Sequence, residues 1–171
     1  MSIETPSRAI ASLYGPSGWT RTGGAADLLA PLVCEPRFTP DFARFAGVGA
    51  LEASALLDLL PAANLHDRQN NGPELRELLD AAQDREGIEL SGYLIGPPRW
   101  DERVSVDGIL VPFADDLPVG ALGDPLVYAH WPAVREALGL TSARGLPDEF
   151  HPVAIAPAQG ARMCAWWIWW D

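Results

Sequence analysis

The stretch Met163–Asp171 reads MCAWWIWWD and holds four of the seven Trp residues of the chain. Trp favours β-strands and carries a large apolar surface. Successive side chains of a strand point to opposite faces. One face then carries Cys164, Trp166, Ile168 and Trp170, and the other carries Met163, Ala165, Trp167 and Trp169. Because each face has two Trp, we expect one face to lie on the protein's own core and the other to need a further cover.

Three interpretations of this segment remain open. It is a central strand buried on both sides, or a strand that presents Trp167 and Trp169 to a homodimer or partner interface. The third interpretation, a short helix at a membrane interface, fits less well because such helices usually carry basic residues.

The rest of the second half also predicts strands. Two apolar segments, Ile88–Ile95 and Val104–Val111, are joined by a loop over residues 96–103. Val153–Ala156 and Met163–Trp170 predict a second hairpin. Clean alternation of apolar and polar residues in Val104–Asp107 predicts that one face there is wet. Leu126–Ala129 is a further short strand candidate, and Pro132–Leu138 predicts a helix that begins with Pro.

The first half predicts short helices. Thr–Pro pairs at Thr5 and Thr39 resemble a helix cap followed by a first-turn Pro, so we expect helices to about Leu13 and across Phe42 and Phe45. Further helices are expected over Ala25–Val33 and Leu51–Leu60. Asn71-Gly72-Pro73-Glu74 has the spacing of a capping box. The helix that follows it carries an apolar stripe of Leu75, Leu78, Leu79 and Ala82.

These elements predict an α+β fold in which short N-terminal helices pack on a mostly antiparallel sheet of four or five strands. The length of 171 residues favours a single globular domain. Its helical half covers about residues 1–86, and its β-rich half covers about residues 87–171.

All 12 basic residues are Arg, and Lys is absent, which is typical of a GC-rich, for instance bacterial, genome. Without Lys, several sites are impossible: a GxxxxGK[ST] phosphate loop, a kinase strand Lys, a Ser-x-x-Lys acyl-enzyme and a pyridoxal Schiff base. No cofactor is expected. The net charge of −11 argues against a nonspecific nucleic-acid binder and favours a soluble acidic protein or one that docks a basic partner.

Neither an apolar run of about 18 residues nor a basic, apolar leader is present, so we expect no membrane span and no secretory signal. Cys34 and Cys164 are far apart and match no metal or redox spacing, which fits a cytoplasmic chain with reduced thiols. The scattered acids Asp115, Asp116, Asp148 and Glu149, together with His151, match no metal-binding spacing, so no metal is expected.

The first candidate site is the polar turn at residues 64–71, which leads into the Pro73 helix. Arg68 could hold a phosphate or carboxylate by a forked contact, and His66 could act as an acid or base. The candidate ligand residues are His66, Asp67, Arg68, Asn70 and Asn71. The competing interpretation is a capped turn whose Asn and Asp side chains satisfy backbone groups.

The second candidate site is the loop at residues 97–103, where Arg99, Trp100 and Arg103 alternate with acids. Trp and Arg are enriched in the residues that dominate binding energy at interfaces. The competing interpretation is that Trp100 folds back as a lid on the core.

Three hypotheses about function follow. The leading one is a noncatalytic cytosolic protein-binding or accessory protein that acts through Arg99, Trp100, Arg103, Trp167 and Trp169. The second is a small enzyme or sensor for an anionic small molecule at the His66–Asn71 turn. The third is a structural subunit that forms homo-oligomers.

Overall fold

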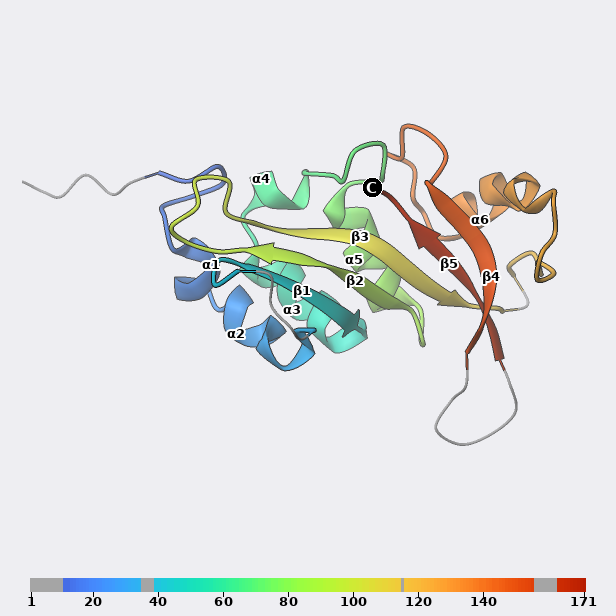
Figure 1. Ribbon diagram of the computed structural model, residues 1–171, viewed down its shortest axis with the longest axis horizontal. Coiled ribbons are helices and arrows are strands. Elements are labelled where there is room, and N and C mark those ends of the chain that lie inside the picture. Colours follow the sequence, from blue (N-terminus) through green and yellow to red (C-terminus); the bar gives the residue numbers. More distant parts are fainter. Residues whose placement is uncertain (1–10, 35–38, 115, 156–162) are drawn as a thin grey trace, which may run out of the picture.

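The computed structural model describes residues 11–34, 39–114, 116–155 and 163–171. Its centre is a five-stranded antiparallel sheet in the order β1-β2-β3-β5-β4 (Figure 1). The strands are β1 (Phe42–Val48), β2 (Glu89–Ile95), β3 (Arg103–Pro112), β4 (Glu149–Ile155) and β5 (Met163–Trp169). Several short helices, mostly in the first part of the chain, complete the fold. The predicted α+β class is therefore confirmed.

The helices gather mainly beside one face of the sheet. They are α1 (Trp19–Thr22), α2 (Ala25–Leu29), the 3-10 helix η1 (Ala30–Leu32), α3 (Ala50–Leu59), α4 (Ala62–Leu65), α5 (Leu75–Asp84), the 3-10 helix η2 (Val127–His130) and α6 (Trp131–Ala137). In Figure 1, α3 and α5 lie on the far side of strands β1 to β3. The apolar stripe of α5 is buried there as predicted, in a core that also contains Leu56 and Val106.

The Trp-rich segment is a strand, and it is the second strand from one border of the sheet. β5 pairs with β3 on one side and with β4 on the other. Trp166, Ile168 and Trp170 are fully buried. Trp166 stacks on Phe150 with ring centroids 4.4 Å apart. The predicted hairpin with β4 is confirmed, although its turn lies outside the described residues.

The predicted helix after Thr39 is wrong, because Phe42–Val48 forms β1. Alternation explains the strand: Ala43 and Phe45 are buried on one face, whereas Phe42 and Arg44 are only partly buried on the other. Gly47 has a φ of +81° and lies at an irregularity of the β1–β2 register. The cap-plus-Pro pattern was misleading because pairing with β2 outweighs a local helix preference.

Two other short predictions also differ. Leu126–Ala129 is not a strand, because most of it lies in η2. Just before η2, the Leu126 amide donates a hydrogen bond to the Asp124 side chain at 2.8 Å. Such a side-chain bond to the backbone favours a tight turn over extended chain. The helix expected from Thr5 falls mostly outside the described residues, and Ala11–Leu13 forms no helix.

The wet face predicted for Val104–Asp107 is wrong, because Ser105 and Asp107 are both buried. Val106 and Gly108 of β3 pair with the adjacent residues Gly92 and Ser91 of β2. Asp107, between them, is therefore an extra residue at a bulge. Beyond this bulge β5 no longer pairs with β3, and Asn64 takes its place by binding both the N–H and the C=O of Val104. The chain at residues 67–69 lies beside Ser105, and Arg44 binds the Asp107 carboxylate.

The capping box predicted for α5 is also wrong, although the helix itself is confirmed. Glu74 stands at the helix cap position with extended backbone angles. Its carboxylate binds His66 and Arg68 instead of the helix backbone, and its amide donates to the Ser142 hydroxyl at 2.8 Å. A carboxylate that already binds two side chains is not available for the reciprocal contact that a capping box needs.

The two border strands differ in how they are protected. Beside β1, the amide of Cys34 donates to the Arg44 carbonyl at 2.8 Å, so another segment pairs with this border. β4 forms the other border and contains Pro152.

Candidate functional site: the open face of the sheet

We use the name open face for the side of the sheet that points away from α3 and α5. Pairing across the strands places one set of side chains on it, which includes Phe42, Arg44, Ser91, Tyr93, Arg103, Glu149, Trp167 and Trp169. Asp107, at the bulge, joins this set through its ion pair with Arg44. These residues come from all five strands, and several of them are partly exposed.

An ion pair fixes the middle of the open face. Arg44 on β1 reaches across β2 and donates two hydrogen bonds to Asp107 on β3, at 2.7 and 3.0 Å. Burial raises the pKa of Asp107, and the hydrogen bonds and charge of Arg44 counteract this increase without cancelling it. The pair therefore holds a buried carboxylate beneath a guanidinium that keeps part of its surface in water.

Tyr93 organises the neighbouring region. Its ring stacks on Phe42 with centroids 5.4 Å apart, and the Arg103 guanidinium lies 5.6 Å from its centroid. Arg103 also donates to the Tyr93 hydroxyl, which in turn donates to the Gln69 side chain at 2.9 Å. Arg103 is thus held by internal contacts, which include a cation–π contact between its guanidinium and the Tyr93 ring.

Tyr14 and Asp67 border this region. Burial, followed by a hydrogen bond to Asp67, raises the pKa of Tyr14 to about 12. Asp67 therefore interacts with Tyr14 and does not orient His66, so the sequence neighbours His66 and Asp67 do not form an acid–base pair.

Trp167 and Trp169 occupy the part of the open face formed by β5. Both are partly buried, in contrast to Trp166 and Trp170. The Trp167 indole N–H donates to Glu149 on β4 at 2.8 Å. Its ring lies over Gly108, where a Cβ atom would come within 2.8 Å of the ring. The cover that the sequence predicts for the second face of this strand is therefore only partial, since Trp167 and Trp169 stay partly exposed.

The loop at residues 97–103 lies at one end of the open face. Trp100 is 70% exposed, so it is not folded back on the core. Arg99 forms a fork with Asp101, whose pKa is lowered by these hydrogen bonds. Glu102 is buried and accepts hydrogen bonds from the Gly18 amide and from the amide and hydroxyl of Thr20. The base of the loop is therefore fixed by buried polar contacts, while its Trp stays in water.

A hollow connects the loop to the open face. It has a volume of about 400 Å³ and is lined by Thr39, Phe42, Arg44 and Arg99. A shallow site that combines an aromatic ring with two guanidinium groups suits a side chain from another macromolecule better than an enclosed metabolite.

The His66–Asn71 turn is occupied by its own contacts. His66 and Arg68 both bind Glu74, at 2.8 and 3.0 Å, and Arg68 also donates to the Ser142 carbonyl. The hydrogen bond from His66 is the largest cause of a lowered pKa at Glu74. Asn70 binds the carbonyl of Asp171, and the Asn71 carbonyl accepts from Arg144. The turn thus connects α5 to the C-terminus.

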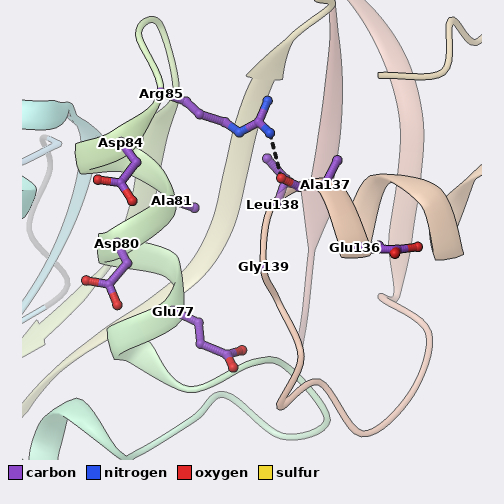
Figure 2. Close-up of a pocket in the computed structure, with 9 residues that line it drawn as sticks. All are labelled: Glu77, Asp80, Ala81, Asp84, Arg85, Glu136, Ala137, Leu138 and Gly139. Atoms are coloured by element: carbon purple, nitrogen blue, oxygen red, sulfur yellow. Dashed lines mark hydrogen bonds between the residues drawn. The ribbon is translucent and has the colours of Figure 1, made fainter. Parts of the chain in front are cut away.

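Sequence reasoning missed a cleft between α5 and α6 (Figure 2). Its volume is about 550 Å³, and its lining includes Glu77, Asp80, Asp84 and Glu136. Arg85 crosses its upper end and donates to the Ala137 carbonyl at 2.6 Å. The acids come from two helices that are far apart in sequence, so no local spacing could have revealed the cleft.

Within the described ranges, no group of three or more His, Cys, Asp and Glu side chains is arranged to hold a metal ion. Among the described helices, none has both the length and the apolar character needed to cross a bilayer. Comparison of the chain with protein-family models, curated proteins and solved structures gives no match.

Proposed function

We propose that the chain is a noncatalytic protein-binding or accessory protein that engages its partner through the open face and the adjoining 97–103 loop. The observation that carries this proposal is the exposed Trp100 beside a broad, partly exposed aromatic and Arg surface. Interfaces concentrate their binding energy in such Trp, Tyr and Arg residues.

The fixed base of the loop supports the proposal. Glu102 and the Arg99–Asp101 fork hold the loop before any partner arrives. A preorganised surface loses less conformational entropy on binding than a mobile one. A partner protein that binds this surface is therefore expected to contact Trp100 as the main anchor and Arg99 through polar groups.

The anion-binding alternative at the His66–Asn71 turn has weaker support. Glu74 binds both His66 and Arg68, so an anionic ligand would have to displace an internal carboxylate. The homo-oligomer alternative would use the same open face, and the experiment below separates it from a heterologous partner.

The test is an Arg99→Ala/Trp100→Ala variant in partner capture from a lysate of the source cells. Captured proteins are identified by mass spectrometry and the complex is rebuilt from purified components. The variant should lose the complex while its melting temperature stays near that of the wild type, because Trp100 is 70% exposed and the loop keeps the buried Glu102 contacts when the Arg99–Asp101 fork is removed. Leu51→Ala on α3 is the matched control, since Leu51 is exposed but lies outside the open face.

Unchanged binding of the rebuilt complex by the Arg99→Ala/Trp100→Ala variant would contradict the proposal for this loop. A complex that contains only the chain itself, detected by light scattering, would replace the heterologous partner with self-association. In that case the same variant should return the protein to a monomer.

A further inference from the structure

The segment at residues 117–128 is fixed to the protein through its inner side. Leu117 is buried, and the Pro118 carbonyl accepts a hydrogen bond from the Trp166 indole N–H at 3.0 Å. Gly120 lies so close to Trp166 that a Cβ atom there would be 2.3 Å from the ring. The buried Trp166 side chain thus holds the backbone of this segment in place.

The outer side of the same segment is apolar. Val119, Leu122 and Leu126 are 70, 65 and 73% exposed. Tyr128 is also exposed, and its hydroxyl donates to the Asp148 carbonyl at 3.1 Å, which brings it beside the exposed Leu146. These five residues are more than half of the nine large exposed apolar side chains of the described residues.

Such a concentration is unusual for a surface that meets only water. Single exposed Leu residues are common, but grouped ones mark interaction sites. Burial of Leu117, the hydrogen bond from Trp166 to Pro118 and the close approach of Gly120 to Trp166 fix the backbone from which these side chains extend. The segment therefore displays these side chains in a fixed arrangement.

The charges around this surface are mostly negative. Among the described residues, Asp116 and Asp124 lie in or beside the segment and Asp148 and Glu149 follow Leu146 closely, whereas Arg144 precedes Leu146 as an exposed cation. Asp116 pairs with Arg85, whereas Asp124 has His130 at 3.8 Å. An apolar surface bordered by carboxylates is complementary to an apolar segment bordered by Lys or Arg.

We propose that Val119, Leu122, Leu126, Tyr128 and Leu146 form a docking surface for a cationic amphipathic segment of a partner protein. This surface shares no residue with the open face, so the proposal does not depend on the function proposed above. A second copy of this chain, with its net charge of −11, would bring further negative charge to the same border. An anionic lipid surface would meet the same repulsion.

The test uses two synthetic amphipathic peptides of equal length, one of Leu and Lys and one of Leu and Glu, titrated by calorimetry. The Leu/Lys peptide should bind the wild type and the Leu/Glu peptide should not. Leu126→Ser should weaken binding about 10-fold, as expected for an apolar anchor at an interface. Asp124→Asn keeps the acceptor for the Leu126 amide and should weaken binding about 3-fold through charge alone.

Leu51→Ser is the matched control, because Leu51 is 83% exposed on α3. It should bind the Leu/Lys peptide like the wild type. The proposal is overturned if Leu126→Ser binds normally, if Leu51→Ser loses as much affinity, if both peptides bind, or if neither does. Leu126-dependent binding to phosphatidylserine vesicles, or Leu126-dependent dimers in sedimentation, would also overturn it. Thermal melting of each variant confirms that differences do not arise from unfolding.

Discussion

The two faces of β5 carry the same residue type and put it to different uses. Trp166 and Trp170 face the core, where they are buried against Phe150 and Trp131. Trp167 and Trp169 face the other way and stay partly exposed, and Trp167 binds the surface carboxylate of Glu149. The contrast teaches that adjacent Trp residues of one strand can differ in environment: the inner pair completes the core, and the outer pair remains accessible at the surface.

The largest expected effect is on the inner face. Trp166→Ala should lower the free energy of unfolding by about 3–5 kcal/mol, because it removes a buried ring and leaves a cavity. Trp167→Ala should cost clearly less, since its ring is already partly in water. Urea unfolding followed by far-ultraviolet circular dichroism measures both. Equal losses for the two variants would break the comparison.

A second pair of variants tests the same contrast by adding a methyl group instead of removing a ring. Gly120→Ala pushes on the buried Trp166 ring, which has no room to move, and should cost about 1–3 kcal/mol. Gly108→Ala pushes on Trp167 and on the Ser91 hydroxyl. The Ser91 hydroxyl is buried, but the Trp167 ring is partly exposed and can move toward solvent, so a smaller loss is expected. A larger loss at Gly108 would show that the open face is packed more rigidly than its exposure indicates.

The outer face should matter more for binding than for folding. Trp167→Ala/Trp169→Ala should weaken the rebuilt partner complex by about 10-fold or more, a typical result for paired aromatic anchors. Surface plasmon resonance with the purified partner gives the ratio of Kd values. Leu51→Ala again serves as the exposed control. An unchanged Kd would restrict the proposed interface to the 97–103 loop.

The smallest expected effect concerns Tyr14 at the border of the open face. Its pKa is raised in the folded state from 10.0 to about 12, so the folded protein holds this proton more tightly than the unfolded chain. The resulting stabilisation is fully present below pH 10 and is lost as the pH rises toward 12. Tyr14→Phe should flatten this part of the stability profile, as measured by urea unfolding at stepped pH. A profile identical to that of the wild type would mean that Tyr14 contributes nothing to it.

The sequence predicted best where one pattern extended over many residues. The stripe of α5 and the alternation of β5 each bury several side chains, so tertiary packing reinforces the local pattern. The prediction failed at Phe42–Val48, where a cap-plus-Pro pair suggested a helix but pairing with β2 determined a strand. It also failed at Asp107, because a bulge and a distant Arg44 decide whether that carboxylate is wet.

The candidate sites show the same division. Trp100, Trp167 and Trp169 could be named from composition, because large aromatic residues in a loop or on both faces of a strand demand an explanation. The partners of His66 and Arg68 could not be named, since Glu74 reaches both from the start of α5. The exposure of Leu122 and Leu126 could not be foreseen either, because their segment is fixed by a contact between Gly120 and the distant Trp166.

Pro152 has a consequence for how molecules of this protein meet one another. The Trp170 amide binds the Asp107 carbonyl and the Phe113 amide binds the Cys164 carbonyl, so even-numbered residues of β5 turn their backbone toward β3. Odd-numbered residues then turn toward His151 and Val153 of β4, and the backbone of Pro152 points outward. A residue without an N–H at this point deprives an incoming chain of a donor. Pairing of a second chain along the β4 border is thereby hindered at this residue.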